Sequence, residues 1–186
     1  MSKVEELATR YSNHIATPWQ SNLAGEQRII CVVYPPADER RLRAKLGLFE
    51  TATIAAGHKW KDFDFSQTFV RWMMGLEYRE AYFEEPENLV IPLETEFPHF
   101  AANELRVVLT AEDVDSDTVV AAYGVACLYG LTRVSQVLKE VAKDIRGRLV
   151  VFFPGEFENN NYRLLDARDG WNYLAIPITL HNGVMD

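Results

Sequence analysis

The chain has 186 residues, 48% of them hydrophobic and 25% charged, which is the composition of an ordinary globular domain. Nineteen basic against 27 acidic side chains give a formal net charge of -8, which argues against a general binder of the nucleic-acid backbone, because that role needs a basic face. The start, MSKVEELATRY, lacks the apolar core of a signal peptide, and no apolar run reaches the roughly 18 residues of a membrane span. We therefore expect one domain located in the cytoplasm, with no membrane segment.

Cysteines and histidines offer little for metal or disulfide chemistry. Cys31 and Cys127 each lie in an apolar run, where a small buried core residue is expected. The histidines show neither i,i+4 nor zinc-finger spacing: His14, His58, His99 and His181. We expect no metal site and no cofactor.

Strand-like and helix-like segments alternate along the chain. Ile29–Tyr34 is a short apolar run rich in branched residues, typical of a strand buried on both faces. Asp38 then predicts the start of a helix that ends at Gly57. Apolar or small side chains recur in it at spacings of three and four residues: Leu42, Leu46, Phe49, Thr53 and Ala56.

The next segments predict an edge strand and a broken helical region. Residues 60–65 (WKDFDF) alternate in character, which favours an edge strand whose two aspartates are solvated, and Ser66 is expected to cap the following helix. That helix carries a broad apolar stripe: Phe69, Trp72, Met73 and Leu76. Prolines interrupt residues 77–98, which predicts a helical insertion in short pieces. Aromatic side chains among its charges indicate either an exposed helix face or a partner surface: Tyr78, Tyr82 and Phe83.

The remaining predicted elements continue the alternation. They are a helix over residues 98–109, a strand over 119–125, a helix over 132–143, and strands over 149–153 and 173–178. Pro177 in the last strand favours a sheet edge, where a missing N–H does no harm.

Apolar strands separated by helix-length segments indicate an α/β fold. We predict a mostly parallel, Rossmann-like open sheet of about five strands, with helices on both faces and a C-terminal hairpin. A single domain is expected over residues 1–186. It comprises a strand-helix-strand unit over 28–65, a helical segment over 66–117 and a second strand-helix-strand unit with the hairpin over 118–180.

Open parallel sheets place their working loops at the carboxyl ends of the strands. Three loops should therefore converge: YPPADER, ACLYGLTR and PGEFENNNYR. None of them contains a phosphate-binding loop, a dinucleotide fingerprint or a G-x-S-x-G elbow. We expect no catalytic residues.

The segment after the LVVFF strand is the most specialised. PGEFENNN predicts a turn and an exposed loop, and a reverse turn at Asp169-Gly170 would let YRLLD fold back on WNYL as a hairpin. Its polar and aromatic groups either brace this hairpin or form a recognition surface; a catalytic role of Glu156 or Glu158 is a third alternative. The candidate partner surface is Glu156, Asn160, Asn161, Tyr162, Arg163, Arg168, Asp169 and Trp171.

Four segments in this order resemble the BrxB family, a small component of the BREX bacteriophage-exclusion systems: YPPADERRLR, EYREAYFEEPE, GVACLYGLTRVSQVL and VVFFPGEFENNNYRLLDARDGWNYLAIPI. The match is strongest over residues 152–175, with residues 124–135 in support. The resemblance implies a non-enzymatic accessory protein in a complex with a large ATPase, a DNA adenine methyltransferase and the alkaline-phosphatase-like component PglZ. It implies no catalytic residues.

The expected function is therefore a non-catalytic adaptor that binds other BREX components, the PglZ-like protein first. Two alternatives stay open. A degenerate nucleotide-binding or hydrolytic enzyme would use Glu156 and its neighbours. A DNA-contacting accessory subunit would use a local basic patch: Arg40, Arg41, Arg43 and Lys45.

Overall fold

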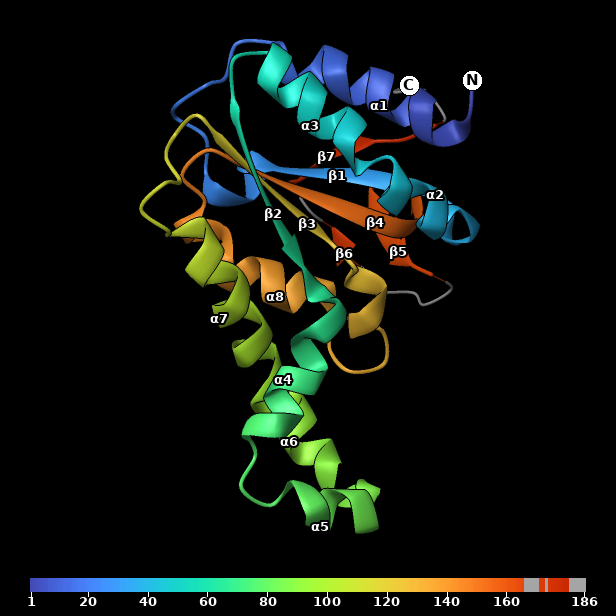
Figure 1. Cartoon of the computed structure of the whole chain (residues 1–186), viewed down its shortest axis with the longest axis vertical. Helices are drawn as coiled ribbons and strands as arrows, with labels where there is room; N and C mark the ends of the chain where they lie inside the picture. Colours follow the sequence, from blue (N-terminus) through green and yellow to red (C-terminus); the bar gives the residue numbers. More distant parts are fainter. Residues whose placement is uncertain (166–170, 173, 181–186) are drawn as a thin grey trace.

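The computed structural model describes residues 1–165, 171–172 and 174–180. At its centre lies an open sheet in which five strands run parallel, in the order β2-β3-β4-β1-β7 (Figure 1). The strands are β1 (Ile29–Tyr34), β2 (Lys59–Asp64), β3 (Thr118–Tyr123), β4 (Arg148–Glu158) and β7 (Ile176–Ile178). The predicted fold class is confirmed, and both strands expected at an edge, β2 and β7, lie at the edges.

Helices cover both faces of this sheet (Figure 1). One face carries α1 (Lys3–Ile15), α2 (Glu39–Ala44) and α3 (Leu46–Ala55); the other carries α4 (Thr68–Gly75), α7 (Phe97–Leu109) and α8 (Val134–Val141). Two short helices, α5 (Arg79–Glu84) and α6 (Val90–Thr95), connect α4 to α7 and project beyond the sheet. Short 3₁₀ turns fill the connections: η1 (Gly25–Arg28), η2 (Pro36–Asp38), η3 (Phe65–Gln67), η4 (Pro86–Leu89), η5 (Val125–Leu128) and η6 (Ala142–Asp144).

Strand β1 explains why an uninterrupted apolar run forms the middle of the sheet. All six residues are buried, and successive side chains of a strand point to opposite faces. The odd-numbered side chains from Ile29 to Val33 belong to the core beneath α4, α7 and α8. The even-numbered ones from Ile30 to Tyr34 belong to the core beneath α1 and α3. A strand covered on both faces therefore has no position for a polar side chain.

Helix α1 is absent from the predicted elements, although its signals are present in the sequence. Ser2 and Glu5 form a capping box, in which the Glu5 carboxylate accepts from the Ser2 N–H at 2.7 Å and the Ser2 hydroxyl accepts from the Glu5 N–H at 3.3 Å. Buried side chains recur at spacings of three and four residues. The hydroxyls of Tyr11 and Thr53, 2.6 Å apart, join α1 to α3.

The helix predicted between Asp38 and Gly57 is broken into α2 and α3. The break lies at Lys45, whose ψ of 14° is outside the helical range, and Asp38 makes no side-chain cap. Its carboxylate instead accepts a hydrogen bond from Arg41 at 3.0 Å. Gly57 ends the helix with a left-handed φ of 87°, as expected. Predicted inward positions that are fully buried are Leu42, Phe49 and Thr53.

Strand β4 continues well past its predicted end at Phe153. It runs to Glu158, so the predicted turn at Pro154-Gly155 is wrong and both residues lie inside a strand. Up to Pro154 the strand pairs in parallel with β1, and from Gly155 it pairs antiparallel with β5 (Asn161–Leu164). The change of partner occurs at the proline, where a missing N–H interrupts a continuous ladder least.

The turn of this β4-β5 hairpin is formed by Asn159 and Asn160. Both have left-handed backbone angles, with φ values of 50° and 60°, which asparagine adopts more readily than most residues. Strand β5 also pairs antiparallel with β6 (Trp171–Asn172), so the predicted pairing of YRLLD with WNYL is present. The reverse turn expected at Asp169-Gly170 lies outside the described residues.

Gly155 is a point of close backbone approach in the hairpin, because a Cβ there would lie 1.9 Å from the carbonyl oxygen of Arg163. We expect Gly155→Ala to lower the free energy of unfolding by about 1–3 kcal/mol, since the two strands have to move apart. The control is Gly47→Ala in α3, where nothing lies within 4 Å and alanine should stabilise the helix by about 0.5–1 kcal/mol. Urea unfolding measures both changes, and equal midpoints for the two variants would contradict the described geometry.

Candidate functional site

The loops that follow β1, β2 and β3 meet at the carboxyl edge of the sheet through one side chain, Arg43. Its guanidinium donates to Glu39 at 2.8 Å on its own helix, to Asp64 at 3.2 Å and to the Ser66 hydroxyl at 2.8 Å. It also lies 5.3 Å from the ring centroid of Tyr123, within cation–π range. Sequence reasoning places Arg43 in the basic patch and does not connect it to Asp64 or Tyr123, because that contact depends on the packing of three loops.

Each ionisable group of this cluster has a partner. Burial alone would raise the pKa of Asp64, but hydrogen bonds from Ser66 and Arg43 outweigh it and leave that pKa lowered. Burial also acts to lower the pKa of Arg43, and its bonds to Glu39 and Asp64 leave it raised. The Tyr34 hydroxyl donates to Glu39, and burial with this carboxylate raises the pKa of Tyr34. The cluster is therefore an ion-paired junction between loops.

Gly124 allows this junction to close. It has a left-handed φ of 74°, and a Cβ there would lie 2.4 Å from the Asp64 carboxylate and 2.9 Å from the Ser66 hydroxyl. Ser66 itself does not cap α4 as predicted. Its N–H instead donates to Asp64 at 2.9 Å, and α4 begins two residues later, at Thr68.

A double-mutant cycle with Arg43→Met and Asp64→Asn measures the junction. Since the two groups are partly exposed, we expect a coupling free energy of about 0.5–1 kcal/mol at pH 7. The native pKa of Asp64 is below its ordinary value, so the stabilisation is present above roughly pH 4 and is lost as pH falls through the native pKa. Unfolding followed by circular dichroism at several pH values tests this, and a coupling that grows on acidification would contradict it.

The predicted partner surface on the hairpin is only partly present at the surface. The prediction that Tyr162 belongs to an exposed partner surface is wrong. Tyr162 is fully buried, and its hydroxyl donates to the carbonyl of Ala175 at 2.9 Å. It therefore braces the hairpin from inside. Glu156 and Arg163 lie opposite each other on β4 and β5, with their charged atoms 3.9 Å apart.

The other members of that surface lie at the hairpin tip or beyond the described side chains. Asn160 is exposed, and the amide of Asn161 donates to the carbonyl of Asn159 at 3.1 Å. Arg168 and Asp169 lie outside the described residues, and Trp171 is described only as a member of β6.

The candidate nucleic-acid patch was expected to present free positive charge, but three of its four basic side chains form ion pairs. Arg41 pairs with Asp38 at 3.0 Å, and Lys45 pairs with Glu5 at 2.5 Å. Arg43 is the centre of the junction described above. Only Arg40 remains as an exposed cation of the four with no ion pair recorded among the described residues. Neutralised cations displace few counterions from a phosphate backbone, so this observation disfavours DNA contact at α2.

The two cysteines differ, and the prediction that both are buried is wrong for Cys127. Cys31 is fully buried in β1, and burial raises the pKa of its thiol to about 12. Cys127 lies exposed in the turn after β3.

We therefore expect a thiol reagent such as DTNB to react rapidly with one thiol per native chain and with two after unfolding, because the protonated, buried thiol is not nucleophilic. Cys127→Ser should remove the rapid phase. Two rapid thiols in the native protein would contradict the burial of Cys31.

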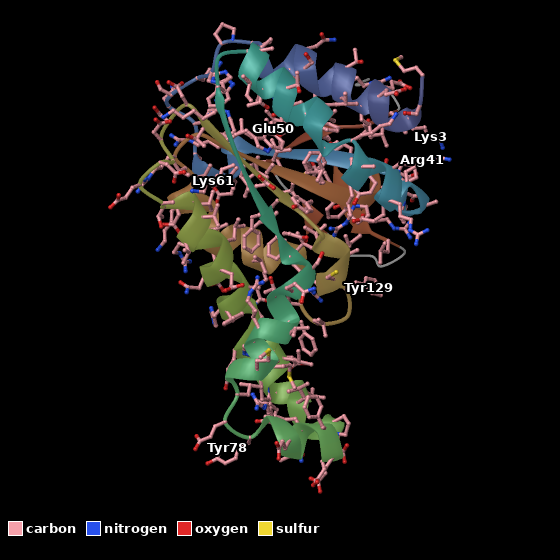
Figure 2. The ribbon with its side chains drawn as sticks, in the orientation of Figure 1. Lys3, Arg41, Glu50, Lys61, Tyr78 and Tyr129 are labelled. Atoms are coloured by element: carbon pink, nitrogen blue, oxygen red, sulfur yellow. The ribbon has the colours of Figure 1, made fainter. Side chains whose placement is uncertain are left out.

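A helical arm projects away from the central sheet (Figure 1). We define the arm as residues 74–96, which include α5, η4 and α6, and Figure 1 shows it leading away from the sheet to its tip at α5. The insertion in short pieces is thus confirmed. Five large apolar side chains of the arm are at least half exposed: Met74 (65%), Tyr78 (66%), Phe83 (68%), Val90 (52%) and Ile91 (72%). Figure 2 shows Tyr78 directed away from the arm near its tip.

The base of the arm is well packed. Phe97 lies 5.7 Å from Phe69 and 5.2 Å from Trp72, measured between ring centroids, and these three rings join α4 to α7. Arg71 and Glu104 add an ion pair between the same helices. The arm is therefore anchored in the core beneath the sheet.

A groove of about 530 Å³ lies where the arm meets the carboxyl edge of the sheet. Its walls come from α6 and the start of α7, from the loop over residues 129–133, from α8 and from β5. The lining includes Leu93, Leu131 and Leu164 as apolar contacts, and Glu94 and Arg133 as charges. The groove thus connects the arm to the hairpin and to the loop after β3.

Among the described residues, no group of three or more His, Cys, Asp or Glu side chains is arranged to hold a metal ion. None of the helices in the described ranges is both long and apolar enough to cross a membrane. Comparisons with protein-family models, with curated proteins and with solved structures gave no match to this chain.

Proposed function

We propose that the chain is a non-catalytic adaptor of a BREX-type phage-exclusion complex, located in the cytoplasm, which binds another component of that complex. The PglZ-like protein is the first candidate partner. The proposal rests on the resemblance to the BrxB family and on one observation that supports it. The segment with the strongest match, residues 152–175, and the segment in its support, residues 124–135, border the same groove beside an arm of exposed apolar side chains.

The two segments reach the groove from different parts of the sheet. Residues 129–133, from GVACLYGLTRVS, form one wall, and Leu164, from NNYRLLD, contributes to another. The arm supplies Leu93 and Glu94. Exposed apolar side chains beside a groove with a few charges are typical of surfaces that bind proteins. A binding role accounts for features of this surface that neither the core nor the junction at Arg43 requires.

Co-purification tests the proposal. The full chain, tagged, is mixed with each component of the defence complex expressed separately, beginning with the PglZ-like protein. We expect one component to be retained through size-exclusion chromatography as a complex, with a dissociation constant of about 1 µM or lower. A chain that retains none of the components would refute the adaptor function.

A further inference from the structure

We infer that the arm is the docking surface of the chain and that its partner is a protein surface with an apolar centre and a rim of lysine and arginine. The inference deepens the proposed function and rests on it. It goes beyond that function by naming the surface and the chemistry of the partner.

Several large apolar side chains of the arm are mostly exposed. Tyr78, Phe83 and Ile91 expose about two thirds of their surface or more, whereas Leu89 and Leu93 in the same segment pack against the core. Removing large exposed apolar side chains from water favours association with a partner that covers them.

The charge around these side chains is strongly acidic. The arm contains seven glutamates and one basic residue, Arg79, a net charge of -6 out of -8 for the chain. The glutamates are Glu77, Glu80, Glu84, Glu85, Glu87, Glu94 and Glu96, and all seven are exposed. In the part of the chain that the structure describes, none of them forms an ion pair, whereas four glutamates outside the arm each pair closely with a lysine or an arginine: Glu5, Glu6, Glu39 and Glu104.

The negative charge of the arm favours some binding partners over others. A second copy of the chain, docked arm to arm about a twofold axis, would bring two clusters of -6 together. Nucleic acid and anionic lipid surfaces are repelled for the same reason. A basic rim on a partner protein gains attraction instead, and such rims mainly accelerate association and set specificity.

The apolar centre is tested with the triple variant Tyr78→Ala/Phe83→Ala/Ile91→Ala, and the ligand is the component retained in the co-purification. We expect the affinity of the variant for that component to be at least about 30-fold lower than the affinity of the native chain, as for anchors at the centre of an interface. The control is Val107→Ala on α7, which removes a side chain that is 63% exposed outside the arm and should leave affinity unchanged. Because every changed side chain is exposed, we expect all variants to fold. Thermal unfolding of each variant checks this.

The acidic rim is tested with Glu84→Lys/Glu87→Lys against the charge-matched control Glu50→Lys/Glu112→Lys. All four glutamates are exposed, but Glu50 and Glu112 lie outside the arm. We expect the arm variant to lose at least about 10-fold in association rate and the control to lose much less, with the difference shrinking between roughly 0.05 and 0.5 M salt. Surface-based kinetic measurements give both rates.

The outcomes separate the two proposals. A component that binds both arm variants as tightly as the native chain would overturn the docking surface and leave the adaptor function standing. If no component binds, the adaptor function fails, and the docking surface fails with it. Dimerisation through the arm in sedimentation experiments, or binding to duplex DNA or to vesicles containing phosphatidylserine, would overturn the assignment of a basic protein partner.

Discussion

The change of partner along β4 fixes the position of the β4-β5 hairpin relative to the parallel sheet. The first part of the strand hydrogen bonds to β1 and β3 and is buried on both faces. Beyond Pro154 the same strand leaves the parallel sheet and begins an antiparallel hairpin. A rigid central strand therefore extends directly into the hairpin, so the hairpin has a fixed position relative to the carboxyl edge and one wall of the groove is held by the core.

The parts of the fold that could be predicted are those encoded by local patterns. The run IICVVY and the prolines of the insertion each specify their structure within a few residues, and both were predicted correctly. Helix α1 has an equally local signal in its capping box of Ser2 and Glu5, although α1 is absent from the predicted elements. The prediction of a turn at Pro154-Gly155 is wrong, because a proline and a glycine usually end strands and the local sequence does not contain the pairing with β5 that continues this one.

The candidate sites depended more on tertiary contacts and were predicted less well. Tyr162 resembles a surface anchor in sequence, but its ring packs against Phe153 and Phe157 and its hydroxyl has a partner inside the protein. Arg43 resembles part of a basic patch until Asp64, 21 residues away, is brought beside it. The arm was predictable in part. Its composition indicates either an exposed helix face or a partner surface, but only the fold shows how much of each apolar side chain remains exposed.

The aromatic contacts at the base of the arm have a consequence for the thermodynamics of association. A segment that becomes ordered only on binding loses about 1–2 kcal/mol per residue in backbone conformational entropy. The rings of Phe69, Trp72 and Phe97 tie α4 to α7 at the base of the arm, and the arm is built from consecutive turns of helix. Much of this conformational entropy is therefore lost during folding, before the partner binds. The partner would contact a surface whose shape is already fixed.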